Sequence, residues 1–162
     1  MSAEQTVEAE IGALLQHYRL TLAVAESATG GLIAARIVNV PGSSAYFKGG
    51  VVAYDNGIKE SVLRVRSDTL AAYGAVSEET AREMAEGVRQ LMRADVAISD
   101  TGIAGPTGGT PTKPVGLFYI GLASAQGTRA QEYFFSGTRA DIRHQAVERA
   151  LMMLRDYLRG LP

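Results

Sequence analysis

Apolar residues recur along the chain with two different spacings. In three stretches they return every three or four residues, which is typical of helices that bury one face. The three stripes are Val7, Ile11, Leu14, Leu15 and Tyr18; Ala81, Met84, Ala85, Val88 and Leu91; and Ile142, Ala146, Val147, Ala150, Leu151, Leu154 and Leu158. Ser77 and Thr138 are the expected caps of the second and third helices, and Ser2 with Gln5 is an expected capping box for the first.

Short continuous apolar runs lie between these helices. Runs of this kind, bounded by Gly, Pro, Asn or Asp, are typical of buried strands. The predicted strands are residues 21–25, 49–54, 95–99, 115–123 and 130–135. The last two are expected to form a hairpin through Gln126 and Gly127, and residues 30–38 and 59–63 are expected to add two further helices.

This order of elements predicts the fold class. Early strands that alternate with helices, followed by a hairpin, indicate an α/β domain: a three-layer α/β/α sandwich with a mostly parallel mixed sheet of about five strands, one of them antiparallel. We expect residues 1–162 to form this single domain. Ligands of such sheets bind beyond the carboxyl ends of the parallel strands. Three segments should meet there: "AESATGG" (25–31), "YDNGIK" (54–59) and "DTGIAGP" (100–106).

Composition narrows the possible functions. The chain has 162 residues, of which 46% are hydrophobic and 20% charged, with a formal net charge of −1. This balance is typical of a soluble globular protein and does not favour direct nucleic-acid binding. We expect neither a membrane span nor a signal peptide, and hence a cytoplasmic location. With no cysteine and two histidines, His17 and His144, the sequence offers no evident metal site, and we expect no metal or other cofactor.

Two loops and one arginine are candidates for binding an anion. Ser27 or Thr29 is expected either to cap a helix or to help a glycine-rich turn hold a phosphate. The loop 101–114 is either a binding loop or a surface excursion. Arg139 follows Gly137 at the start of the last helix and is either a phosphate contact or ordinary surface charge. The expected substrate contacts are Ser27, Thr29, Gly30, Gly31, Gly102, Gly105 and Arg139.

The stretch "PGSSAYFKGGVVAYDNGIK" (41–59) carries the most reactive chemistry. A serine hydroxyl becomes a nucleophile when a base takes its proton, and a desolvated lysine is a suitable base where histidine is lacking. Ser44, Tyr54 and Lys59 supply a hydroxyl, a phenol and an amine. Alternatively, Ser43 or Ser44 caps a turn, Tyr54 packs at a strand end and Lys59 is solvated. Spacing alone favours this second interpretation.

Five ordered motifs carry a resemblance to a known family. They are "AESATGGLIAARI", "VPGSSAYFKGGVVAYDNGIK", "YGAVSEETAREMAEGVR", "ADVAISDTGIAGPTGGTPTKPVG" and "FFSGTRADIR". Together they resemble the CinA C-terminal domain family, which includes stand-alone nicotinamide-nucleotide amidases (NMN deamidases). The resemblance extends from about Thr21 to the last helix.

The resemblance implies an activity and a set of residues. It implies a homodimer that hydrolyses nicotinamide mononucleotide to nicotinate mononucleotide and ammonia without a metal. The Ser-Tyr-Lys catalytic set of the family falls on Ser44, Tyr54 and Lys59. A further hydroxyl falls on Thr101, and the arginine of a Gly-x-Arg motif falls on Arg139.

Two positions depart from the pattern of the family. Ala28 stands where the family usually has cysteine, and Asp100 stands where an apolar or hydroxyl residue is more usual. A carboxylate at Asp100 is expected to alter the pKa of Lys59 or to repel a phosphate. An amidohydrolase is therefore the first hypothesis, favoured by Ser44, Tyr54 and Lys59. The second is a non-catalytic nucleotide-binding module with a regulatory role in competence or DNA damage.

Overall fold

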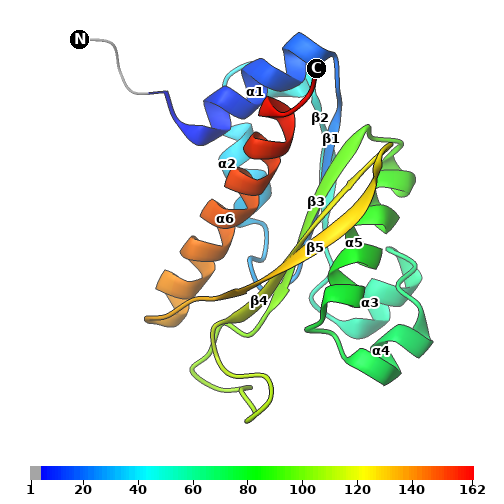
Figure 1. The fold of residues 1–162 in the computed structure, drawn as a ribbon, viewed down its shortest axis with the longest axis vertical. Coiled ribbons are helices and arrows are strands. Elements are labelled where there is room, and N and C mark those ends of the chain that lie inside the picture. Colours follow the sequence, from blue (N-terminus) through cyan, green and yellow to red (C-terminus); the bar gives the residue numbers. More distant parts are fainter. Residues whose placement is uncertain (1–4) are drawn as a thin grey trace.

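The computed structural model describes residues 5–162, and a five-stranded sheet runs through its centre (Figure 1). The strand order is β2-β1-β3-β4-β5. The strands are β1 (Leu22–Glu26), β2 (Phe47–Val52), β3 (Val96–Gly102), β4 (Leu117–Ser124) and β5 (Gly127–Phe134). β1 pairs in parallel with β2 and β3, whereas β4 pairs antiparallel with both β3 and β5. The prediction of a mostly parallel mixed sheet with one antiparallel strand is confirmed.

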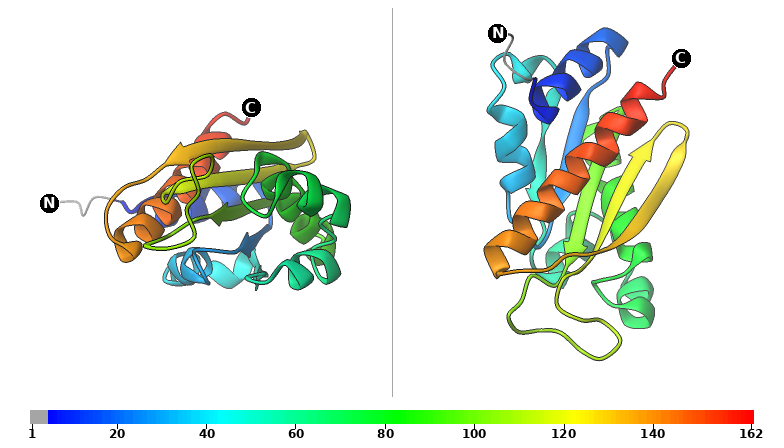
Figure 2. Two further views of the ribbon diagram at one scale, coloured as in Figure 1. Left: turned by 90° about the horizontal axis from the view of Figure 1, so that it is seen from below. Right: turned by 60° about the vertical axis from the view of Figure 1, so that its left-hand side comes forward.

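Helices cover both faces of this sheet, as the two views in Figure 2 show. One face carries α1 (Val7–Tyr18), α2 (Leu32–Val38) and α6 (Arg139–Arg159), which contact one another. The other face carries α5 (Glu78–Met92), which contacts all five strands. Three short elements complete the fold: the 3-10 turn η1 (Ser43–Ala45), α3 (Asn56–Ser61) and α4 (Ser67–Tyr73). The sequence did not predict α4, and α3 begins three residues before the predicted helix.

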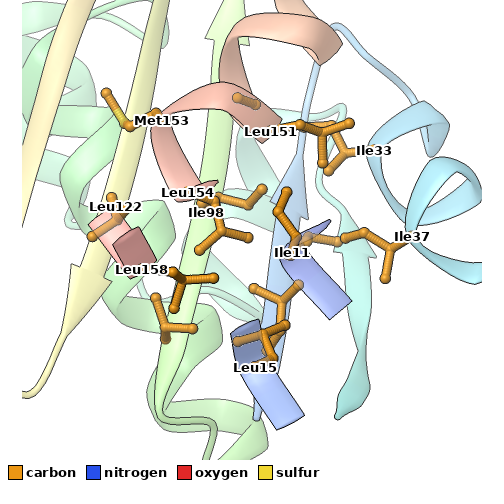
Figure 3. Packing of buried hydrophobic residues seen from close by; sticks show 14 of the residues in the cluster. Ile11, Leu15, Ile33, Ile37, Ile98, Leu122, Leu151, Met153, Leu154 and Leu158 are labelled. Atoms are coloured by element: carbon orange, nitrogen blue, oxygen red, sulfur yellow. The ribbon is translucent and has the colours of Figure 1, made fainter. Parts of the chain in front are cut away.

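The larger core lies between the sheet and the layer of α1, α2 and α6 (Figure 3). All seven residues of the apolar stripe predicted for the last helix are buried. On the opposite face the strands present Ala23, Ala25 and Ala97 to α5, and these small side chains let the helix approach closely. The apolar stripe of α5 is buried as predicted except at Leu91, which is 53% exposed. Leu91 lies in the last turn of the helix, where Met92 packs against the core instead.

Side-chain caps fix the starts of α1, α5 and α6. Thr138 accepts a hydrogen bond from the backbone N–H of Asp141 in a capping box, and Ser77 accepts one from Thr80, so both predicted caps are confirmed. α1 is capped by Thr6. The capping box predicted from Ser2 lies outside the described residues. Within residues 5–162, no helix combines the length and the apolar character needed to cross a membrane.

Candidate functional site

A polar pocket lies where the parallel strands β1, β2 and β3 end. β1 lies between β2 and β3, so the connection after β1 leads to one side of it and the connection after β2 leads to the other. α/β proteins bind ligands at such a topological switch point. The pocket has a volume of about 190 Å³. It is lined by Ser27, Ala28, Tyr54, Asn56, Lys59, Ala75, Val76, Thr101, Gly102, Ala104 and Arg139. The three segments predicted to meet at this edge of the sheet all contribute.

Lys59 and Ser27 form the most reactive pair in the pocket. Ser27 follows directly on β1, and Lys59 lies in α3, whose first turn is capped by Asp55. The Nζ atom of Lys59 lies 3.0 Å from the Oγ atom of Ser27 and donates a hydrogen bond to the Ala53 carbonyl at 2.7 Å. Lys59 is only 1% exposed, and this burial lowers the pKa of its amine, although the charges of Asp100 and Asp55 oppose the shift. A buried lysine with a lowered pKa can exchange a proton with a neighbouring hydroxyl.

Two buried carboxyl groups hold the loop that carries Ser27. Glu26 accepts hydrogen bonds from the backbone N–H groups of Ile33 and Ala34 and from the Thr29 hydroxyl. Asp100 accepts hydrogen bonds from the backbone N–H of Ser27 at 3.0 Å and from that of Thr29 at 3.2 Å. Burial raises the pKa of Asp100 to about 6. The two carboxyl groups thus hold the loop from its buried side, and Ser27 on its other side lines the pocket.

This arrangement corrects part of the predicted glycine-rich binding turn. Thr29 is fully buried, and its hydroxyl points to the two carboxyl groups rather than to the pocket. Gly30 and Gly31 adopt φ values of +61° and +105°, which lets the chain turn sharply into α2. Neither glycine lines the pocket. Their conformation explains their presence as turn residues, whereas Ser27 and Ala28 are the residues of this turn that line the pocket.

Arg139, Tyr54 and Thr101 also line the pocket. Arg139 donates hydrogen bonds to the Gly105 carbonyl at 2.8 Å and to the Tyr54 hydroxyl at 3.2 Å. Lys59 approaches only the backbone carbonyl of Tyr54, at 3.5 Å, so the Tyr54 phenol is not in place to relay a proton from Lys59. The Thr101 hydroxyl donates to the Ala75 carbonyl at 2.6 Å and so joins β3 to the segment before α5.

Ser44 lies at the other end of the sheet. It is exposed in η1, just before β2, and the neighbouring Tyr46 carbonyl accepts a hydrogen bond from Leu22 at the start of β1. β2 has six residues and, at about 3.3 Å per residue, extends roughly 17 Å. Within one chain, the expected pairing of Ser44 with Lys59 is therefore not formed. The hydroxyl that Lys59 meets is that of Ser27, which the sequence suggested only as a substrate contact.

The pairing of Ser27 with Lys59 had a signal in the sequence. Ser27 directly follows the first strand and Lys59 follows the end of the second, whereas Ser44 precedes the second strand. Because the ends of parallel strands share one edge, this order places Ser27 and Lys59 together. Sequence reasoning also missed Arg143 of α6, which donates to the carbonyls of Ala28 at 2.9 Å and Thr29 at 3.0 Å. It lies one helical turn after Arg139 and so shares its face of the helix.

Comparisons with known proteins agree on one family. The family model described as "CinA C-terminal domain" matches residues 4–158 of this chain. A putative competence-damage inducible protein of Thermoanaerobacter sp. (strain X514) is 52% identical over 158 residues, which cover 98% of this chain and 38% of that protein. A CinA-like protein of Sulfurihydrogenibium sp. (strain YO3AOP1) is 48% identical over 158 residues, covering 96% and 40% respectively. The chain thus spans about two fifths of the length of these curated relatives.

Solved structures share the whole fold. A CinA superfamily protein from Klebsiella pneumoniae 700603 has a TM-score of 0.92 at 33% identity, covering 96% of this chain and 97% of that one. A competence/damage inducible protein from Agrobacterium tumefaciens has a TM-score of 0.88 at 37% identity, covering 99% and 100%.

Proposed function

Because the chain belongs to the CinA C-terminal domain family, we propose that it is an amidohydrolase that converts nicotinamide mononucleotide to nicotinate mononucleotide and ammonia. Ser27 is the nucleophile of this reaction and Lys59 is the base. The observation that supports this proposal most is the buried Lys59 amine 3.0 Å from the Ser27 hydroxyl. Nucleophile and base at hydrogen-bond distance are the signature of covalent catalysis.

The reaction has two stages that use the same pair. The Oγ atom of Ser27 attacks the carboxamide carbon while the neutral Lys59 amine takes the hydroxyl proton, and a tetrahedral intermediate forms. Lys59 then gives this proton to the nitrogen, the C–N bond breaks and ammonia leaves. Water attacks the resulting ester with Lys59 again as base, which releases the nicotinate carboxylate and restores Ser27.

The lowered pKa of Lys59 is what suits it to this role. A solvated lysine is almost wholly protonated at neutral pH and cannot accept a proton from serine. Burial lowers the pKa of Lys59 and so increases the fraction of neutral amine. The proposed reaction needs no metal ion. Residues 5–162 contain no group of three or more His, Asp or Glu side chains arranged to hold one.

The remaining pocket residues fit the substrate. Arg139 brings a permanent positive charge to the pocket wall, which suits the phosphate of the mononucleotide. Tyr54, Val76 and Ala104 give the pocket an apolar side for a planar pyridine ring. The homodimer and the cytoplasmic location that the sequence suggests remain predictions.

The decisive experiment measures ammonia release from nicotinamide mononucleotide, with the nicotinate product identified by mass spectrometry. The wild type should release ammonia, and the Ser27→Ala and Lys59→Met variants should not. Calorimetric titration with the mononucleotide separates binding from turnover. If the wild type binds the nucleotide but releases no ammonia from it or from related pyridine nucleotides, the amidohydrolase proposal fails and the non-catalytic nucleotide-binding module is supported.

A further inference from the structure

Asp100 is a fully buried acid whose partners all belong to the loop after β1. It lies within β3, opposite Ile120 of β4, and is 0% exposed. Its Oδ1 atom accepts a hydrogen bond from the Ser27 N–H at 3.0 Å and another from the Thr29 hydroxyl. Its Oδ2 atom accepts from the Thr29 N–H at 3.2 Å. One carboxyl group therefore binds three donor groups of two residues, Ser27 and Thr29, and fixes the backbone that carries Ser27.

The same carboxyl group acts on Lys59 through its charge. Burial lowers the pKa of the Lys59 amine, and the charge of Asp100 is the larger of the two opposing influences, ahead of that of Asp55. The titratable and charged groups around the two residues are Glu26 at the end of β1, Tyr54 and Asp55 before α3, and Arg139 and Arg143 of α6. Among these, Glu26 raises the pKa of Asp100 and Arg143 braces the loop from its other side.

We propose that Asp100 is a positioning residue for the reaction proposed above: its carboxyl group fixes the backbone that carries Ser27, and its negative charge holds the proton on Lys59. This inference rests on the proposed function. Its consequence is that Asp100 sets how far the pH must rise before Lys59 becomes a base. Since burial raises the pKa of Asp100 to about 6, the carboxyl group is mostly ionised at neutral pH and above, and its charge acts on Lys59 in that range.

Asp95 offers a matched control in the same molecule. Asp95 directly precedes β3, whereas Asp100 lies near the end of β3, and each binds residues that adjoin β1. The Oδ2 atom of Asp95 accepts from the N–H of Thr21 at 2.8 Å and from the Thr21 hydroxyl at 3.0 Å, before β1 begins. Asp95 thus joins the same two strands at the opposite end of the sheet. If Asp100 had a purely structural role, neither substitution would change the pKa of Lys59.

The experiment compares wild type, Asp100→Asn and Asp95→Asn in two measurements. The first is the pH profile of kcat/KM for ammonia release from nicotinamide mononucleotide. The wild-type rate should rise with pH as Lys59 loses its proton. In Asp100→Asn the midpoint of this rise should lie lower by about one pH unit, because the opposite charge that favours protonated Lys59 is gone. Its plateau should be about fivefold below that of the wild type, since the amide leaves one N–H of the loop without an acceptor. Asp95→Asn should keep the wild-type midpoint.

The second measurement needs no turnover. The side-chain carbon next to the Lys59 amine is followed by NMR as the pH is varied without substrate, with the signal assigned by its loss in Lys59→Met. The pKa of Lys59 should be lower in Asp100→Asn than in wild type and unchanged in Asp95→Asn. Asp100→Ala also removes the charge and serves if the asparagine variant does not fold.

The two measurements keep the two proposals apart. If Asp100→Asn lowers kcat/KM by one factor at every pH and the Lys59 titration matches the wild type, Asp100 is only a structural residue and the inference is overturned. If the wild type releases no ammonia at any pH, the proposed function fails. The NMR titration then decides by itself whether Asp100 holds the proton on Lys59.

Discussion

The two ends of the parallel strands carry the same kinds of side chain in different surroundings. The end where the strands begin has a serine, a lysine and an acid in Ser44, Lys48 and Asp95, and all three are exposed. The end where the strands finish has the same three types in Ser27, Lys59 and Asp100, which are 8%, 1% and 0% exposed. Water screens the first set, whereas the second set interacts at short range in a low dielectric. Burial, rather than the choice of residue, distinguishes the candidate site.

The connections between the elements produce this difference. At the carboxyl ends the chain leads into α2, α3 and the loop before β4, and the residues that directly follow β1 and β2, Ser27 and Ala53, are buried. α3 in particular places Lys59 beneath the end of β2, with its amine bonded to the Ala53 carbonyl. At the amino ends the strands are entered from exposed turns.

Exchanging serine for alanine at each end tests the comparison most strongly. Ser27→Ala should lower kcat for ammonia release by at least about a thousandfold, because loss of a nucleophile usually removes most of the catalysis. Ser44→Ala should keep near wild-type activity, and circular dichroism should show that both variants are folded. Full loss in Ser44→Ala together with full activity in Ser27→Ala would reverse the assignment of the nucleophile.

The two lysines give the second contrast. Lys59→Arg should lower kcat by about a hundredfold or more, because arginine keeps the charge but cannot give up its proton. Lys48→Arg is the matched exchange at the exposed end and should leave kcat unchanged. Substantial activity in Lys59→Arg, measured at steady state over a range of pH, would mean that the residue acts through its charge and not as a base.

Much of the fold could be predicted from the sequence because buried apolar residues recur at the regular spacing of a helix or a strand. The stripe of the last helix was predicted completely, since a helix that packs on a sheet must bury one continuous face. The meeting of three segments at one edge followed from the alternation of strands and helices. The limits of β2 were predicted two residues too late, because this edge strand is only half buried and its apolar signal is weak.

The site was accessible only in part, because closeness in the sequence is a poor guide to closeness in space. Ser44 is 15 positions before Lys59, yet a whole strand separates them, whereas Ser27 is 32 positions away and in contact. The direction of the Thr29 side chain depends on two buried acids, Glu26 and Asp100, that come from different strands. No local pattern contains that information.

The Arg139→Ala variant tests whether the phosphate of the substrate binds at the carboxyl ends of the parallel strands. Arg139→Ala should lower kcat/KM for nicotinamide mononucleotide by about tenfold to a hundredfold, the expected cost of one charge-assisted contact. Nicotinamide riboside, which lacks the phosphate, should be affected much less. Measuring both substrates with both proteins gives the preference directly. An equal loss for the two substrates would assign the phosphate to another part of the pocket.

The smallest expected effect is on the free energy of unfolding, and it concerns Tyr46 at the end of the sheet where the parallel strands begin. Tyr46 is 3% exposed and its ring packs on Gly12 of α1, where an added Cβ would lie 2.4 Å from the hydroxyl. Within residues 5–162 this buried hydroxyl has no hydrogen-bond partner. A buried polar group without a partner is destabilising, so Tyr46→Phe should leave the free energy of unfolding unchanged or raise it by up to about 1 kcal/mol.

A second tyrosine provides the reference for that small change. The Tyr18 hydroxyl donates to the Leu161 carbonyl at 2.9 Å, so Tyr18→Phe should lower the free energy of unfolding by about 1 kcal/mol. Urea denaturation of the two variants and the wild type, with the slope compared as well as the midpoint, measures both effects. kcat/KM should be unchanged in Tyr46→Phe, since the strands place this residue at the end away from Lys59. A loss of stability in Tyr46→Phe equal to that in Tyr18→Phe would show that the Tyr46 hydroxyl is paired, and a loss of activity would show that the beginning end of the strands contributes to the site.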